Sequence, residues 1–204
     1  MIMGVINGSS AAAGMSPDGP GCLEGINCFA LVNYIPGELG VFLDGLRKDL
    51  EPESQYPRAH VTVLPPRPLQ ENATSEQAGG GLDEFLPLMR PFEIVADQIE
   101  IFPCTNVVYL SVGGGFPALV ELHGRLNHGA LLFEECFSYH PHITLAQGLS
   151  AEQAVEIAGE ASRRWAAYTG PRRFEAGTLT FVQNTTRNQW IDLKEYQLPV
   201  IQTA

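Results

Sequence analysis

The sequence has few cysteines, and none of them form a pair of the spacing that binds zinc or makes a redox motif. The 204 residues include four, at Cys22, Cys28, Cys104 and Cys136, without a CxxC pair. A chain of this length buries enough apolar surface to fold without disulfides. We therefore expect reduced, buried thiols. No cysteine adjoins a histidine, which argues against thiol catalysis.

Long hydrophobic runs are also absent. No apolar run reaches the roughly 20 residues that a membrane-spanning helix needs. Residues 1–24 contain no Lys or Arg and are rich in Gly, Ala and Ser, so they lack the basic and apolar regions of a signal peptide. We interpret residues 1–24 as a flexible tail of a cytoplasmic protein that does not bind membranes, and residues 25–204 as a single bilobal domain.

Positive charge is scarce. The chain has 12 Lys and Arg against 23 Asp and Glu, which gives a formal net charge of −11. Broad binding to long nucleic acids depends on many contacts between basic side chains and phosphates, so this composition argues against it. A small nucleotide or an RNA end remains possible as a partner, because a few well-placed donors can hold one phosphate. With 45% hydrophobic residues the chain has the composition of a globular protein.

The sequence contains one strand–helix–strand unit twice. Each copy has a β-prone run, a turn with glycine, a helix with an apolar stripe and a strand that carries a histidine. The predicted elements of the two copies are Cys28–Tyr34, Glu38–Leu50 and Arg58–Leu64, then Val107–Val112, Pro117–Leu126 and Ser138–Ala146. Pro65 and Pro66 are expected to end the first histidine strand.

The two copies agree in register. Leu31 and Leu43 are 12 positions apart, and so are Leu110 and Leu122. The distance from the helix leucine to the strand histidine is 17 positions in the first copy and 20 in the second, a difference that fits a loop insertion. We infer an internal repeat.

Further elements complete an α+β fold with two similar lobes of antiparallel-rich sheets and flanking helices. A capping box at Ser150 and Gln153 predicts the start of a helix that runs to about Tyr168. The other predicted elements are a helix over Thr74–Met89, a strand over Phe92–Phe102, and a hairpin of Thr178–Gln183 with Gln189–Leu193.

The chemistry is predicted to lie in the two histidine strands. Residues i and i+2 of a strand point to the same face, so His60 projects with Thr62 and His142 with Thr144. Two lobes related by an approximate twofold axis can bring these four side chains into one cleft. A neutral imidazole can then act as general base and a protonated one as general acid, while the hydroxyls hold phosphate oxygens.

These residues carry a resemblance to a known family. His60-Val-Thr-Val63 and His142-Ile-Thr-Leu145 are both complete His-hydrophobic-Thr-hydrophobic tetrads. The chain from about Cys28 to Leu198 resembles the two-histidine (2H) phosphoesterase superfamily, which includes 2'-5' RNA ligase and cyclic phosphodiesterase proteins. The resemblance implies the LigT-like fold and hydrolysis of a 2',3'-cyclic phosphate or related phosphodiester, as in RNA processing, without metal or other cofactor. It implies catalytic roles for His60 and His142 and substrate binding by Thr62 and Thr144.

Two other functions fit the same residues. A metal-dependent hydrolase would use imidazole and carboxylate ligands. Besides His142, the candidates are His123, His128, Glu134, Glu135 and His140. A non-catalytic module would bind a nucleotide or phosphate in the same cleft without turning it over.

Several residues near the tetrads have two interpretations. Tyr139 can stack on a base or pack in the core, and packing is favoured because its strand parity is opposite to that of His142. Arg67 and Arg187 are candidate phosphate anchors or plain surface charges. Gly113–Gly115 precedes a predicted helix and suits a tight turn, because it matches no nucleotide-binding glycine motif.

Overall fold

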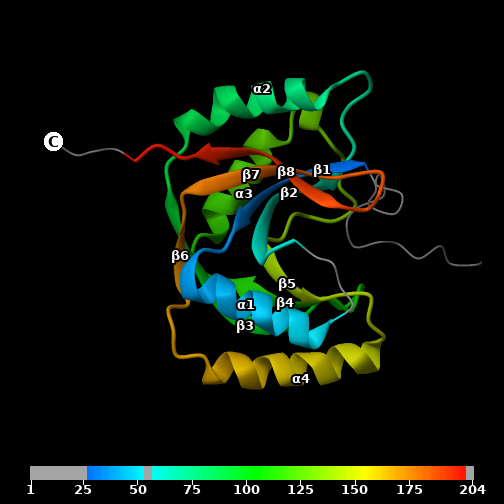
Figure 1. Ribbon diagram of the computed structural model, residues 1–204, viewed down its shortest axis with the longest axis vertical. Coiled ribbons are helices and arrows are strands. Elements are labelled where there is room, and N and C mark those ends of the chain that lie inside the picture. The colour runs from blue at the N-terminus through cyan, green and yellow to red at the C-terminus, as the bar shows by residue number, and fades with distance from the viewer. Residues whose placement is uncertain (1–26, 53–56, 201–204) are drawn as a thin grey trace, which may run out of the picture.

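Two four-stranded antiparallel sheets form the centre of the protein (Figure 1). The computed structural model describes residues 27–52 and 57–200, so the predicted tail lies outside the described residues. The first sheet has the order β2 (His60–Arg67), β1 (Cys28–Tyr34), β7 (Thr178–Asn184), β8 (Trp190–Gln197). The second has the order β5 (His142–Ala146), β4 (Val108–Val112), β3 (Phe92–Ile101), β6 (Arg173–Ala176).

The helices cover the outer faces of the sheets. They are α1 (Gly37–Leu50), α2 (Ser75–Phe85), α3 (Phe116–Leu126) and α4 (Ala151–Ala167), with short 3₁₀ turns η2 (Leu86–Leu88) and η3 (Gly129–Leu131). In each lobe one helix packs on the sheet of the other lobe. The helix α1 follows β1 of the first sheet but packs on β5 and α4, and α3 follows β4 of the second sheet but packs on β2 (Figure 1).

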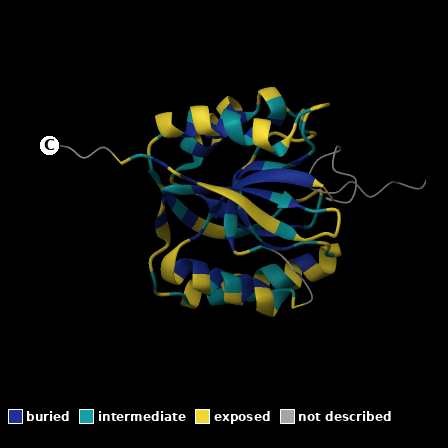
Figure 2. Ribbon diagram, turned by 45° about the horizontal axis from the view of Figure 1, so that its top comes forward, coloured by how far each residue is buried: buried dark blue, intermediate teal, exposed yellow. Residues whose placement is uncertain are grey.

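The internal repeat is present in the structure. In each lobe the histidine strand pairs antiparallel with the first strand of its unit, β2 with β1 and β5 with β4. The four leucines that define the repeat, Leu31, Leu43, Leu110 and Leu122, are all fully buried. The outer helix faces are exposed while the central strands are buried (Figure 2). The predicted α+β class with two similar lobes is confirmed.

Several predicted boundaries and one omission need correction; β2 begins at His60 instead of Arg58, and the last strand ends at Gln197 instead of Leu193. The prolines do not end β2, which continues through Pro65 and Pro66 to Arg67. This is possible because β2 is an edge strand with one sheet neighbour, and because both prolines lie where its register with β1 is irregular, between Leu64 and Arg67. The second histidine strand begins at His142 instead of Ser138. The four-residue strand β6, which pairs with β3, was not predicted.

The expectation of reduced, buried thiols holds for no described cysteine in both respects, and Cys22 lies outside the described residues. Cys104 and Cys136 are free but exposed. Cys28 is buried but disulfide-bonded. Within residues 27–52 and 57–200, no helix is long and apolar enough to cross a membrane.

Candidate functional site

The two histidine strands lie against each other at the junction of the lobes. Both β2 and β5 are edge strands of their sheets, and they are in contact. Their residues alternate: Val61, Val63, Ile143 and Leu145 are fully buried in the core. The residues between them, His60, Thr62, His142 and Thr144, are half-buried on the opposite face. The structure therefore brings the four predicted site residues to one place.

Each histidine is held by the same hydrogen bond. His60 Nδ1 lies 2.6 Å from the carbonyl oxygen of Arg58, and His142 Nδ1 lies 2.7 Å from that of His140. A carbonyl oxygen can only accept a hydrogen bond, so Nδ1 carries the hydrogen in both rings. Each Nε2 is then free to accept a proton from a substrate or, once protonated, to return it.

Both imidazoles are neutral in the ligand-free protein near pH 7. Burial lowers the pKa of His60 to about 4, helped by the positive charge of Arg47 and by His142. Burial also lowers the pKa of His142 to about 4, with a smaller contribution from His140. The carbonyl hydrogen bonds act in the opposite direction but do not offset burial. The two rings project from strands β2 and β5, which are in contact.

The surroundings of His60 are polar and aromatic. The Tyr34 ring lies edge-on to His60 with centroids 6.1 Å apart, and the Arg58 guanidinium lies 4.0 Å over the Tyr34 ring. The Tyr34 hydroxyl donates to Asp192 Oδ1 at 2.6 Å. None of these three neighbours was singled out from the sequence. The position of Arg58, two residues before His60 and so of the same strand parity, is the signal that could have found it.

The surroundings of His142 are mainly aromatic. Phe102 and Tyr109 stack with centroids 3.9 Å apart, and His142 lies edge-on to both, at 4.9 Å and 5.4 Å. His140 also lies edge-on to this pair. The Tyr109 hydroxyl donates to Glu100 Oε2 at 3.0 Å, and burial together with Glu100 raises the pKa of Tyr109 to about 12. The two halves of the site therefore share their histidine geometry but differ in their walls.

Tyr139 and His123 brace the first tetrad. The Tyr139 hydroxyl donates to the Thr62 carbonyl at 2.7 Å, and the Tyr139 ring stacks on His123 with centroids 4.0 Å apart. His123 Nδ1 donates to the Val63 carbonyl at 2.9 Å. Because Tyr139 lies just before β5, this brace connects the segment leading into the second tetrad with the backbone of the first. The packing interpretation of Tyr139 is the one that the structure shows.

Arg67 is not a phosphate anchor. Its side chain is fully buried and forms a salt bridge with Glu135, whose carboxylate also lies 3.5 Å from His123 Nε2. The guanidinium donates further hydrogen bonds to the carbonyls of Pro65 and Leu131 and to the side chain of Asn127. A buried guanidinium needs such partners, and these contacts tie the end of β2 to the segment after α3. Arg187 is exposed in the turn between β7 and β8.

Of the candidate metal ligands, His123 and Glu135 lie close together, but both have structural partners. Glu135 pairs with Arg67, and His123 is buried against β2. Across the described ranges no group of three or more His, Cys, Asp or Glu side chains is arranged to hold a metal ion. The glycine run also has a packing role: at Gly115, whose φ is +85°, a Cβ would lie 2.5 Å from the Glu93 carbonyl oxygen. This favours the tight-turn interpretation.

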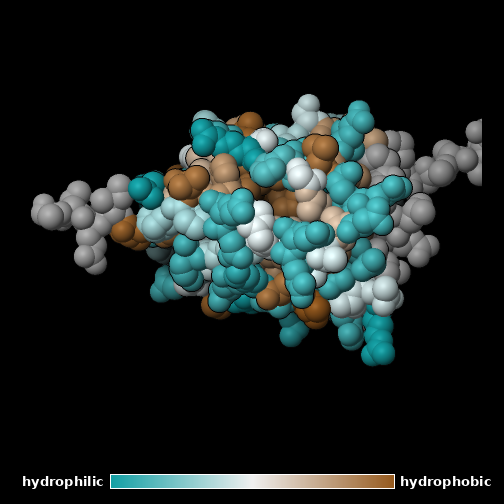
Figure 3. Space-filling model, turned by 90° about the horizontal axis from the view of Figure 1, so that it is seen from above, coloured by the Kyte–Doolittle hydropathy of each residue, from teal (hydrophilic) through white to brown (hydrophobic). Residues whose placement is uncertain are grey.

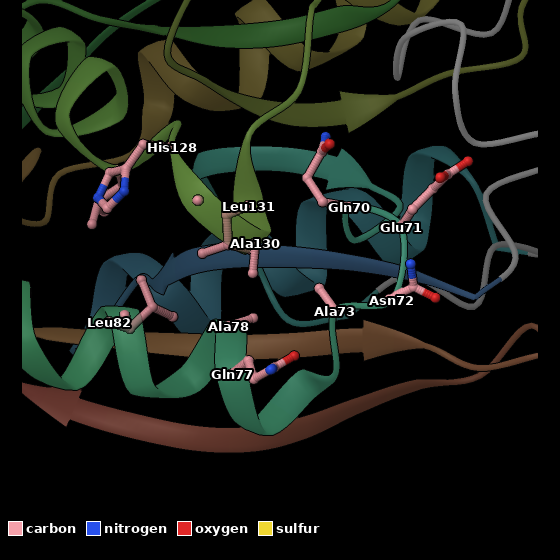
Figure 4. A pocket seen from close by; sticks show the side chains of 13 residues that line it. Gln70, Glu71, Asn72, Ala73, Gln77, Ala78, Leu82, His128, Ala130 and Leu131 are labelled. Atoms are coloured by element: carbon pink, nitrogen blue, oxygen red, sulfur yellow. The ribbon is translucent and has the colours of Figure 1, made fainter.

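A pocket of about 480 Å³ lies away from the tetrads, between α2 and η3. Leu82, Ala78, Ala130 and Leu131 form its apolar part, and Gln70 and Gln77 lie at its rim (Figure 4). Seen from above, the surface is mainly hydrophilic with scattered apolar groups (Figure 3). None of the four tetrad side chains lines this pocket, so it is separate from the histidine site.

Comparison with known proteins decides the family. The family model of the 2'-5' RNA ligase superfamily matches residues 35–188, a range that contains both tetrads. The chain belongs to the 2'-5' RNA ligase superfamily. This agrees with the resemblance to 2H phosphoesterases that the two tetrads predicted.

Curated relatives agree with this membership, and solved structures have a similar fold. A Bacillus cereus (strain AH820) protein named "Putative phosphoesterase" is 27% identical over 117 residues, which cover 57% of this chain and 67% of the relative. The structure of Escherichia coli LigT complexed with 3'-AMP has a TM-score of 0.56 at 18% identity, covering 85% of this chain and 99% of LigT. TT0787 of Thermus thermophilus has a TM-score of 0.53 at 17% identity, with coverages of 84% and 97%. This superfamily member thus has the LigT-like fold, and its relatives support a phosphoesterase.

Proposed function

We propose that this protein hydrolyses a 2',3'-cyclic phosphate, or a related phosphodiester, at a nucleotide or an RNA end without a metal ion. In this proposal His60 and His142 are the general acid and base, and Thr62 and Thr144 hold the phosphate. The observation that carries it is the matched pair of histidines. Each donates Nδ1–H to the carbonyl two residues upstream, which leaves two Nε2 atoms for one substrate.

The proposed reaction follows from these two Nε2 atoms. One neutral imidazole takes a proton from water at Nε2 while the water oxygen forms a bond to phosphorus. The other imidazole, protonated at Nε2, gives its proton to the ribose oxygen whose bond to phosphorus breaks. The product is a phosphomonoester with a free neighbouring hydroxyl. The two threonine hydroxyls donate to non-bridging phosphate oxygens as negative charge grows there.

The negative charge of the substrate is needed to stabilise the protonated form of the imidazole that acts as the acid. In the free protein the pKa of both histidines is lowered to about 4, so neither ring holds a second proton near pH 7. A phosphodiester anion between the rings favours the imidazolium form and raises its pKa. In this proposal, binding of the substrate therefore favours protonation of the histidine that acts as the acid.

The relatives support a nucleotide as this ligand. The crystal structures of E. coli LigT include complexes with 3'-AMP, with phosphate and with ATP. The net charge of −11 argues against a long nucleic acid and favours a small nucleotide or a chain end.

The test is hydrolysis of a panel of 2',3'-cyclic nucleotides in the presence of EDTA. We expect turnover by the wild type and a loss of about 10²- to 10⁴-fold in each of His60→Ala and His142→Ala, because each removes one proton-transfer step. His128→Ala is the matched control, since His128 is exposed after α3 and lies outside the tetrads. Nucleotide binding without turnover would favour the non-catalytic module, and loss of turnover on chelation would favour a metal-dependent hydrolase.

A further inference from the structure

A second pocket, which we call the Trp190 pocket, opens beside His60. Its volume is about 590 Å³, within the range of roughly 300–1,000 Å³ that is usual for small-molecule sites. It is lined by Tyr34, Pro57, Arg58, Asn188, Gln189, Trp190, Ile191 and Asp192. Two lining residues also contact the histidine: the Tyr34 ring lies edge-on to His60, and the Arg58 carbonyl accepts from His60 Nδ1. The pocket and the proposed catalytic site therefore share a wall.

A small buried apolar cluster lies behind two of the pocket's aromatic residues. Ala30, Val32 and Val182 form a buried cluster separate from the main core, and Tyr34 and Trp190 pack against it. Val32 lies opposite Thr62 in the β1–β2 register. The cluster thus supports Tyr34 and Trp190 from behind and lies next to the strand position of Thr62.

The walls of the Trp190 pocket suit a planar, hydrogen-bonding group. The half-buried Trp190 offers an aromatic surface, and the Arg58 guanidinium lies 4.0 Å over the Tyr34 ring while its side chain stays 65% exposed, so it can also stack on a ligand. Asp192 is half exposed and is held in place by the Tyr34 hydroxyl at 2.6 Å and by Arg58 at 3.7 Å. An ionised carboxylate only accepts hydrogen bonds, so it favours a ligand edge that donates N–H.

We propose that the Trp190 pocket binds the base of the substrate nucleotide and that Asp192 selects bases with an exocyclic amino group over uracil. This inference rests on the proposed function, since it names the group attached to the phosphate that lies between His60 and His142. Cytosine presents an amino group where uracil presents a carbonyl oxygen, which the carboxylate repels. The two pyrimidines are equal in size, so this pair of substrates isolates the hydrogen-bonding difference.

The first test compares hydrolysis of cytidine and uridine 2',3'-cyclic phosphates. We expect kcat/KM to favour the cytidine substrate by about tenfold, the usual effect of one hydrogen bond to a charged group. Asp192→Asn should remove or reverse this preference, because the amide can donate to the uracil carbonyl while still accepting from Tyr34. Asp83→Asn is the matched control. Asp83 is also half exposed and also pairs with a cation, Lys194, but it lies on α2 outside the pocket.

A binding experiment separates the pocket from the chemistry. The chain has two tryptophans, and Trp165 is buried beneath Arg172 and hydrogen-bonded to the Asp97 carbonyl. Titration of the His60→Ala/His142→Ala double variant with 3'-CMP should quench tryptophan fluorescence, and Trp190→Phe in that background should abolish the quench.

The outcomes are distinct. Turnover of both cyclic substrates with equal kcat/KM, and no quench, would overturn the pocket but leave the phosphoesterase in place. A quench that depends on Trp190, without turnover in the wild type, would leave the pocket in place but overturn the proposed reaction. A cytidine preference that Asp83→Asn alters as much as Asp192→Asn would also overturn the assignment to Asp192.

Discussion

Removal of one hydroxyl group, in Tyr139→Phe, tests whether the brace behind the first tetrad holds the site. The Tyr139 hydroxyl donates to the Thr62 carbonyl at 2.7 Å, and the ring stacks on His123 at 4.0 Å. The substitution retains the stacked ring and removes only the donor. The Thr62 carbonyl is then left without this partner, which costs about 1–3 kcal/mol for a buried group.

The expected result has two parts. The free energy of unfolding should fall by about 1–3 kcal/mol in urea denaturation, with an unchanged dependence on urea concentration. In the proposed reaction kcat should fall by roughly tenfold or less, because the Thr62 backbone shifts slightly, and this loss is smaller than that of a catalytic histidine.

Tyr168→Phe is the matched control for this experiment. The Tyr168 hydroxyl has a longer contact, 3.4 Å to the Pro171 carbonyl, in an exposed position. This change should alter stability by about 0.5 kcal/mol or less. If Tyr139→Phe is as mild as Tyr168→Phe in both stability and kcat, the brace does not stabilise the tetrad and the reasoning is refuted.

Four other changes have defined outcomes. Because both site histidines have a pKa lowered to about 4 in the free protein, kcat/KM should decline as pH rises above about 5. The decline of kcat should begin at a higher pH, because bound phosphodiester raises the pKa of the acid. Initial rates between pH 4 and 9 check this, and a kcat/KM that increases up to pH 9 contradicts it. The same lowered pKa values mean that the unfolded chain binds more protons than the folded protein between about pH 6.5 and 4. The free energy of unfolding should therefore fall as pH drops through that window. Replacing both histidines with Gln should reduce this pH dependence in denaturation curves. Thr62→Val and Thr144→Val keep the side-chain shape but remove a hydroxyl. Each should lower kcat by about 10²-fold with nearly wild-type stability. A change in KM alone would contradict a role in the transition state. Arg67→Met leaves the largely buried Glu135 carboxylate without its arginine partner. This should lower the free energy of unfolding by about 3 kcal/mol in a denaturant titration. Substitution of an exposed arginine that only binds phosphate would not lower the stability in this way.

The repeat and the tetrads could be predicted because they depend on local patterns. Alternation in β2 and β5 places one side of each strand in the core, and the four leucines of the repeat keep equivalent buried positions. The helix over Ser75–Phe85 was also predictable despite three glycines. A capping box of Thr74 and Gln77 fixes its start, and Gly79 gives room to the Tyr196 hydroxyl, which donates to its carbonyl at 3.2 Å.

What the sequence did not predict depends on contacts between distant segments. The prolines at the end of β2 are compatible with a strand because β2 lies at a sheet edge and its register with β1 is irregular there, which no local pattern reveals. The segment before His142 is not a strand, because Tyr139 there turns to stack on His123 of α3. The exchange of α1 and α3 between the lobes follows from the packing of whole elements.

The part of the site that escaped sequence analysis has the same cause. Tyr34 and Asp192 are 158 positions apart and meet because β1 and β8 flank β7 in one sheet. Arg67 and Glu135 are 68 positions apart and form a buried pair that composition and charge could not distinguish from surface residues. The repeated local pattern predicted the histidines and threonines, whereas the residues that surround them are brought together by the topology.

The central claim is that His60 and His142 act on one substrate as a single acid–base pair. The most direct measurement is a double-mutant cycle on cyclic nucleotide hydrolysis with EDTA present, using His60→Ala, His142→Ala and the double variant. Groups that act as a unit give non-additive losses, so we predict that the double variant is scarcely slower than either single variant. A loss in the double variant equal to the product of the single losses would mean that the histidines act independently, and would contradict the account.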